Sequence, residues 1–320
     1  MDSRSYLDRH VQGLLPWMDL VQEIIVVDSQ STDGSPEFLK ETLGHRNLRV
    51  VQHPPGLYAS WNYGIAQLQT DFFIMSTTGD TITREGVVRL MDCASQERLD
   101  VVLGKPIFED IRGRKKKYVW PLDDILEDHR RTGPHVAFSG LEAIVHAIGR
   151  PNSALLGSSA SNLYHTEFFR NRPFPLDWGV AGDGGWVWQH AVEARWGAIP
   201  GTHSKFLIHP PQSRREDLKP KLQQRADWTL RESVPRWISS GIISKDQLEA
   251  IEFEKLAACL TEYLDAKEDL DAIRKAGVPW VFSPAAWKKR IKRRRAFSAL
   301  RAAREKSLVS LRSIDSRDAD

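Results

Sequence analysis

Apolar and polar positions divide the first third of the chain into two kinds of segment. The β-branched runs at residues 23–28 (EIIVVD) and 48–52 (LRVVQ) lack polar alternation, which is typical of buried parallel strands. Helical spacing follows each run, and Pro36 and Gly44 mark the start and end of the first helix. Residues 71–77 (DFFIMST) predict a third strand. This alternation predicts an α/β fold with a mainly parallel sheet flanked by helices.

Beyond residue 80 the sequence predicts further helices and strands, and the whole chain divides into three regions. Residues 83–97 predict a helix with Thr83 as its N-cap, and residues 101–120 predict a strand pair. WVWQHAVEARWG predicts a helix that ends at Gly197, and KFLIHP predicts a short strand. From there on the pattern is helical and charged. We therefore expect an α/β domain over residues 1–215, a helical extension over 216–284 and a basic tail over 285–320.

Composition excludes several classes of protein. Of the 320 residues, 41% are hydrophobic and 27% charged, which is ordinary for a globular chain and unlike collagen or a disordered segment. No apolar run approaches the roughly 18 residues of a membrane helix, and the start shows no signal-peptide pattern. Cys93 and Cys259 stand far apart, outside any zinc-ligand spacing. These features predict a cytoplasmic protein without structural zinc.

The net charge of +3 conceals an uneven distribution. Residues 285–320 hold 12 Lys/Arg and four Asp/Glu, whereas the rest of the chain holds 33 basic and 38 acidic residues. The tail therefore favours a polyanionic partner, which could be an anionic membrane surface, a nucleic acid or an acidic protein.

Two aspartates follow predicted strands. Asp28 ends the first strand, and Asp80 lies just past the third. Ligands of open α/β sheets bind beyond the carboxyl ends of the strands, so both residues could serve a nucleotide and its divalent metal. Aspartates are also common in turns at strand ends, so a purely structural role stays open for each.

Five segments in order resemble family 2 glycosyltransferases, which have the GT-A (Rossmann-like) fold. They cover roughly residues 5–215 and read EIIVVDSQSTDGS, GLYASWNYGIAQLQTDFFIMSTTGDTITREGVVRL, DVVLGKPIFEDIRGR, WGVAGDGGWVWQHAVEARWGAIP and FLIHPPQSR. The family usually opens with an apolar strand and a Pro-Thr-x-Asn loop. The sequence starts in the helix that follows, so we expect that strand to be missing.

The resemblance implies an inverting transfer of sugar from a nucleotide-diphosphate sugar to a hydroxyl of a glycan or lipid-linked acceptor. Asp28, Thr77, Gly79 and Asp80 would bind the donor. Asp80 and His209 would hold a divalent cation, Mn²⁺ or Mg²⁺, that neutralises the departing diphosphate. The family's DXD site reads TTGD in this sequence, which leaves Asp80 as its one acidic residue. His209 could equally be a strand-end histidine with local hydrogen bonds.

Inversion needs a general base, and the resemblance assigns this role to Asp183 in the segment AGDGG. The neighbouring glycines would leave space for a bulky acceptor at Gly184, and Trp186 would stack on a sugar ring. The alternatives are an N-cap role for Asp183 and a core position for Trp186. The competing function is a non-catalytic GT-A-like module that binds a nucleotide or sugar.

The tail permits two interpretations. Its apolar residues Phe297, Leu300, Leu308 and Leu311 fall on one side of a helix beside a run of basic residues. This pattern is typical of a helix that lies on an anionic membrane, which would make the protein peripheral to the inner membrane face. A solvated charged tail is the alternative. A nucleic-acid or scaffold role is less favoured, because the run lacks interleaved aromatic residues.

Overall fold

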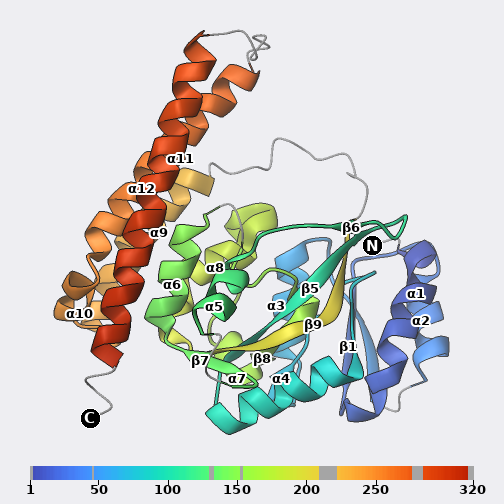
Figure 1. Ribbon diagram of the computed structural model, residues 1–320. Coiled ribbons are helices and arrows are strands. Elements are labelled where there is room, and N and C mark those ends of the chain that lie inside the picture. The colour runs from blue at the N-terminus through green and yellow to red at the C-terminus, as the bar shows by residue number, and fades with distance from the viewer. Residues whose placement is uncertain are drawn as a thin grey trace. The chain divides into compact units, whose positions relative to one another are not determined.

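The computed structural model describes residues 3–44, 47–129, 133–151, 154–208, 222–275 and 284–315 (Figure 1). The chain divides into two compact units, the first made of Met1–Ser139, Leu155–Trp186 and Ala194–Lys219, and the second of Gly140–Ala154, Val187–Glu193 and Pro220–Asp320. These units do not follow the boundaries expected from the sequence. None of the described helices combines the length and the apolar character that crossing a membrane requires.

Both units contain helices, and they make up most of the second unit. The first unit contains α1 (Arg4–Leu14), α2 (Ser35–Leu43), α3 (Leu57–Ala66), α4 (Arg84–Glu97), α5 (Pro121–Asp128), α7 (Thr166–Arg170), the start of α8 (Gly182–His190) and the 3-10 turns η1 (Leu15–Leu20), η2 (Ser159–Ser161) and η3 (Leu176–Ala181). The second unit contains α6 (Gly140–Gly149), η4 (Ala191–Glu193), α9 (Leu222–Ser239), α10 (Lys245–Ala250), α11 (Phe253–Lys275) and α12 (Pro284–Asp315).

The strands form two sheets in the first unit. β1 (Ile24–Asp28) and β2 (Leu48–Gln52) are parallel, as predicted, but the expectation of buried strands is wrong, because Asp28 is the one buried residue in the two strands. The larger sheet has the order β3-β8-β5-β9-β4, with β6 on β5 and β7 on β9. Its strands are β3 (Phe72–Phe73), β4 (Thr81–Ile82), β5 (Val101–Asp110), β6 (Lys115–Lys116), β7 (Val136–Phe138), β8 (Leu163–His165) and β9 (Trp196–Ile208).

The α/β class is confirmed, and the two longest strand pairings, β1 with β2 and β5 with β9, are parallel. Within the described strands of the larger sheet, β5 and β9 are the single parallel pair, and the other five pairings are antiparallel. The run over residues 71–77 contributes only the two-residue β3, which pairs antiparallel with β8. The repeated strand–helix pattern therefore ends at β2, and the larger sheet is built mostly from strands that lie far apart in the sequence.

Local signals predicted several element ends. The Thr83 hydroxyl accepts a hydrogen bond from the Gly86 amide at 3.1 Å, as an N-cap does. Gly44 ends α2 in the left-handed conformation, with φ of 53°. The predicted helix end at Gly197 is wrong, because β9 already begins at Trp196. Gly197 permits a close approach instead, since a Cβ there would lie 2.3 Å from Leu99 Cδ1.

The core of the first unit lies between α1, α4 and the larger sheet. It contains the buried side chains Val11, Leu14, Trp17, Leu43, Ile82, Val87, Leu90, Cys93, Ala94, Leu99, Val102, Leu163 and Ile199. A second, aromatic group includes Phe169 and Trp186, whose rings stack with centroids 4.3 Å apart. This aromatic group borders the candidate site described below.

In the second unit, α12 packs along α11 and α6 (Figure 1). Leu300, Leu308 and Leu311 are buried, and the Phe297 ring lies 5.3 Å from the Tyr263 ring. The apolar side of the tail is therefore part of the unit's core. The expectation that these residues contact a membrane is wrong, because helix packing already covers them.

Candidate active site

Asp183 lies in the first turn of α8, and its carboxylate is held on one side. Oδ1 accepts hydrogen bonds from the Tyr58 hydroxyl at 3.0 Å and from the Gly184 amide at 2.8 Å. No other described residue donates a hydrogen bond to Oδ2. The helix dipole also favours a negative charge in this turn. The carboxylate is thus fixed through one oxygen, and the described residues leave the other oxygen without a donor.

Tyr58 reaches Asp183 from α3, and close packing fixes the position of its ring. The side chain is 5% exposed, and its ring lies against those of Trp61 and Phe174, with centroids 5.0 and 5.5 Å away. A Cβ on Gly182 would lie 2.5 Å from Tyr58 Cδ2. Glycine at 182 is therefore required for the tyrosine to reach the start of α8.

Burial governs the electrostatics of this pair. Desolvation raises the pKa of the half-buried Asp183 carboxyl, and the hydrogen bonds from Gly184 and Tyr58 only partly oppose the rise. Burial and the nearby Asp183 charge raise the pKa of Tyr58, so its hydroxyl stays protonated and donates. Asp183 therefore holds a proton more readily than an ordinary surface aspartate, which suits a general base.

The two acceptor-side residues predicted from the sequence differ in exposure. A Cβ on Gly184 would meet no described atom within 4 Å, so open space adjoins the carboxylate there. Gly185, in contrast, packs against Trp178, where a Cβ would lie 2.4 Å from Cδ2. Trp186 is fully buried, and its indole N–H donates to the Arg172 carbonyl at 2.7 Å. The prediction that Trp186 stacks on a sugar is therefore wrong, because the core covers its ring.

Asp80 closes the turn that replaces the family's DXD site. Its amide donates to the Thr77 carbonyl at 3.0 Å, and Gly79 takes the positive φ, 96°, that a type II turn places at its third residue. Oδ2 accepts from the Thr77 hydroxyl at 2.6 Å, and Oδ1 accepts from the Leu207 amide at 2.8 Å. Asp80 is 3% exposed. Its carboxylate ties the turn to β9.

His10 supports this turn from α1, a contact that the sequence did not indicate. Nδ1 lies 3.1 Å from the Asp80 carbonyl oxygen and 3.3 Å from the Gly79 nitrogen. Burial lowers the pKa of His10, so the ring is neutral near pH 7. Gly13, one turn further along α1, allows the approach, because a Cβ there would lie 2.2 Å from Thr81 Cγ2.

The residues around Asp80 do not by themselves fit a divalent cation. Across the described ranges, no three His, Cys, Asp or Glu side chains come together in a group that could hold a metal. Both Asp80 oxygens already accept hydrogen bonds. His209, the second predicted ligand, lies outside the described residues. We therefore derive no step through a metal.

Asp28 stands at the carboxyl end of β1, as predicted. Its Oδ2 accepts from the Ser31 amide at 3.0 Å, which shapes the loop that follows. Gln30 in that loop has φ of 60°, an uncommon conformation for a residue other than glycine. The loop also contacts α3, since the Ser29 and Ser60 hydroxyl oxygens are 3.3 Å apart.

The structure connects two of the three predicted aspartates through α3. Ser60 contacts the loop after Asp28, and Tyr58, two residues earlier, holds Asp183. Asp80, by comparison, makes its contacts with α1 and β9. Sequence reasoning missed Tyr58, although its place at the start of a helix that follows a parallel strand points to the ligand edge of the sheet.

Comparisons with known proteins bear on the family and the fold. Residues 2–147 match the profile of the family described as Glycosyl transferase family 2. No curated protein matches the sequence.

Similar solved structures include S. aureus TarS residues 1–349 in complex with UDP-GlcNAc, at 16% identity and a TM-score of 0.53 over 95% of this chain and 88% of that one. The complex of the same TarS fragment with UDP has 16% identity and a TM-score of 0.50, over 94% and 88%. The longer TarS structure has 18% identity and a TM-score of 0.50, over 95% of this chain and 53% of that one. These likenesses confirm the GT-A fold.

Proposed function

We propose that the protein transfers a sugar, with inversion, from a nucleotide-diphosphate sugar to a hydroxyl group of a glycan or lipid-linked acceptor, as the match of residues 2–147 to the Glycosyl transferase family 2 model suggests. The observation that carries the proposal is the Asp183 carboxylate, which is held through one oxygen beside the open space at Gly184. We place the acceptor hydroxyl in that space, next to the oxygen that has no donor among the described residues.

The proposed reaction is a single displacement. The acceptor oxygen forms a bond to the anomeric carbon as the bond from that carbon to the diphosphate breaks, and the configuration inverts. The acceptor proton passes to Oδ2 of Asp183, and the bonding electrons leave with the nucleoside diphosphate. The raised pKa of Asp183 increases its affinity for that proton in the transition state.

Tyr58 acts in this scheme as a positioning residue. Its hydroxyl and the Gly184 amide hold Oδ1, which fixes the orientation of the carboxylate and leaves Oδ2 without a donor among the described residues. The packed rings of Trp61 and Phe174 restrict the tyrosine, so the carboxylate is oriented before the acceptor binds. Precise orientation matters because proton transfer requires hydrogen-bond distance to the acceptor hydroxyl.

The donor is expected at the carboxyl end of β1, where Asp28 has one oxygen without a hydrogen bond from a described residue. A ribose or base can donate to that oxygen. TarS was crystallised with UDP and with UDP-GlcNAc, so UDP-GlcNAc is the first donor to test.

The experiment combines binding with turnover. Thermal unfolding with UDP, GDP or dTDP identifies the nucleotide, because a ligand at 100 times its dissociation constant stabilises the folded state by about 2.7 kcal/mol. Nucleoside diphosphate release from the matching sugar donor, measured with a panel of glycan acceptors, then reports transfer. Acceptor-dependent release supports the proposal. Donor binding without any release over the whole panel favours the non-catalytic binding module.

A further inference from the structure

The first turns of α12 expose two large apolar side chains amid positive charge. Trp287 is 56% exposed and Ile291 is 39% exposed, one helical turn apart. The opposite side of the helix packs inward, since Ala296 and Leu300 are buried. Trp287 and Ile291 therefore lie on the solvent side of a helix whose other side is already used for packing.

Exposed cations flank this pair along the same helix. Lys288, Lys292, Arg294 and Arg295 are exposed and lie within one or two turns of Trp287. The 32-residue α12 holds eleven Lys/Arg and two Asp/Glu. We call Trp287, Lys288, Ile291, Lys292, Arg294 and Arg295 the α12 patch.

Neighbouring acidic groups neutralise only part of the α12 patch. Asp269 on α11 pairs with Lys289 at 3.2 Å and with Lys292 at 3.6 Å. Lys288, Arg294 and Arg295 form no ion pair with any residue in the described part of the chain. Those three side chains keep their charge for an external anion.

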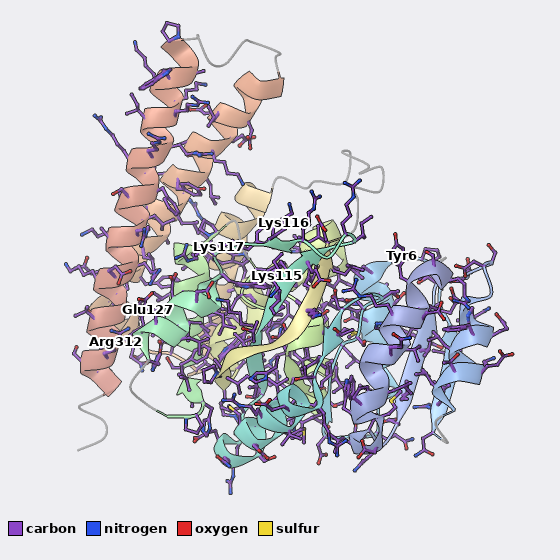
Figure 2. The ribbon with its side chains drawn as sticks, turned by 45° about the vertical axis from the view of Figure 1, so that its right-hand side comes forward. Tyr6, Lys115, Lys116, Lys117, Glu127 and Arg312 are labelled. Carbon is purple, nitrogen blue, oxygen red and sulfur yellow. The ribbon has the colours of Figure 1, made fainter. Side chains whose placement is uncertain are left out.

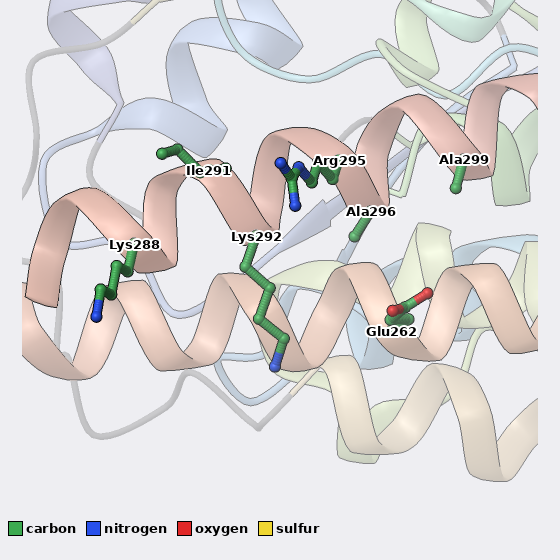
Figure 3. A pocket seen from close by; sticks show the side chains of 7 residues that line it. All are labelled: Glu262, Lys288, Ile291, Lys292, Arg295, Ala296 and Ala299. Atoms are coloured by element: carbon green, nitrogen blue, oxygen red, sulfur yellow. The ribbon is translucent and has the colours of Figure 1, made fainter.

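A groove beside the α12 patch adds room for an anionic group. It measures about 420 Å³. Figure 3 shows Lys288, Ile291, Lys292 and Arg295 lining it from α12, and Glu262 lining it from α11. Lysine, arginine and one isoleucine around a shallow opening suit a phosphate that is attached to an apolar chain.

We propose that the α12 patch binds the surface of an anionic lipid bilayer. Trp287 and Ile291 would enter the boundary between headgroups and acyl chains, and Lys288, Arg294 and Arg295 would contact lipid phosphates. Nucleic acid explains the patch less well, because Trp287 is its one aromatic residue and Ile291 beside it offers no ring on which successive bases could stack. The site differs from the one that the sequence predicted, since Leu300, Leu308 and Leu311 are buried.

The test is co-sedimentation of the full chain with vesicles. One set contains phosphatidylcholine alone, and the other contains phosphatidylcholine and phosphatidylglycerol in equal parts. We expect binding to the anionic set only. It should weaken as salt rises from about 0.1 M to about 1 M, where the Debye length falls from about 10 Å to about 3 Å. Part of the vesicle binding should persist at high salt, because Trp287 and Ile291 bind through apolar contacts that salt does not screen.

Two variants separate the contributions within the α12 patch. Lys288→Gln/Arg294→Gln/Arg295→Gln should weaken anionic-vesicle binding by about tenfold or more at low salt, since each cation near such a surface adds to binding. Trp287→Ser/Ile291→Ser should remove the salt-resistant remainder. All of these side chains are exposed, so both variants should keep the thermal unfolding midpoint of the wild type.

The chain offers a matched control in the exposed residues Lys115, Lys116 and Lys117, labelled in Figure 2. Lys115→Gln/Lys116→Gln/Lys117→Gln removes the same charge from the first unit and should leave vesicle binding unchanged. An equal loss in this control overturns the proposal, because net charge alone would then explain binding. Equal sedimentation of wild type and patch variants also overturns it. So does patch-dependent binding to an oligonucleotide without binding to vesicles.

Discussion

Asp80 and Asp183 are both carboxylates beside a glycine-containing turn, but their surroundings differ. Each oxygen of Asp80 accepts a hydrogen bond, one from Thr77 and one from Leu207 on β9. Asp183 receives both of its hydrogen bonds at Oδ1, next to the open space at Gly184. The first carboxylate joins parts of the fold, whereas the second has one oxygen without a donor among the described residues.

This difference separates structural from chemical roles better than sequence position does. A buried carboxylate with both oxygens occupied contributes to stability, because its loss leaves donors unpaired. A carboxylate with a raised pKa and an available oxygen can take a proton. Substitution of Asp80 should therefore lower the free energy of unfolding, whereas substitution of Asp183 should lower turnover.

The largest expected effect is on turnover. Asp183→Asn should lower kcat by about 10²–10⁴, the usual contribution of a general base, and leave donor affinity unchanged. Steady-state release of nucleoside diphosphate measures the first quantity, and thermal shift with the nucleotide measures the second. Asp183→Glu is the control, because it keeps a carboxylate in a displaced position and should retain an intermediate rate.

The next effect is on folding. Asp80→Ala should lower the free energy of unfolding by about 1–3 kcal/mol for each of the two donors, Thr77 and Leu207, that it leaves unpaired. Asp183→Asn should not destabilise the protein at pH 7. The pKa of Asp183 is raised in the fold, so its stabilising contribution exists at low pH and is lost as pH rises through the folded pKa.

Denaturant unfolding of the two variants checks this contrast. Nucleotide affinity of the wild type and of Asp80→Ala, measured by thermal shift in Mn²⁺ and in EDTA, tests whether Asp80 is a metal ligand. If Mn²⁺ raises nucleotide affinity in the wild type and fails to do so in Asp80→Ala, Asp80 is a metal ligand and its assignment as a purely structural residue is wrong.

A smaller effect concerns the glycines around Asp183. Gly182→Ala should destabilise the fold by about 1–3 kcal/mol, because the new Cβ would overlap the Tyr58 ring. Gly184→Ala is the matched control and should fold normally, since its Cβ meets no described atom. Thermal unfolding compares the two. Equal destabilisation would contradict the proposed opening at Gly184.

The smallest effect is a shift in pH dependence. The Tyr58 hydroxyl lowers the pKa of Asp183, so Tyr58→Phe should raise that pKa further. A hydrogen bond to a charged carboxylate contributes about 1.5–3 kcal/mol, which corresponds to a shift of up to about two pKa units. The acidic limb of kcat should move to higher pH while the ring packing is kept. An unmoved limb would remove Tyr58 from the positioning role.

Sequence reasoning succeeded where local chemistry determines the outcome. The β-branched runs of β1 and β2, the Thr83 cap and the Gly44 end depend on neighbouring residues, and all are confirmed. It failed where distant segments decide. The antiparallel partner of β3 is β8, some ninety residues away, which a strand–helix repeat could not indicate.

In the candidate site, too, sequence reasoning found what local motifs determine and missed what distant contacts determine. The family resemblance placed Asp28, Asp80 and Asp183, but a sequence does not state which oxygens are occupied. Leu207 and His10, which hold the Asp80 turn, are far from it in the chain. Trp186 shows the limit most clearly, since its exposure depends on Phe169 and Arg172 covering it.

The central claim is that Asp183 accepts the acceptor proton, and the pH dependence of turnover in the wild type and in Asp183→Asn tests it most directly. We expect kcat of the wild type to fall as pH decreases through a pKa above the value of about 3.9 for an ordinary aspartate. The residual turnover of Asp183→Asn should lack this acidic limb. An Asp183→Asn variant with wild-type turnover and the same acidic limb would contradict the account.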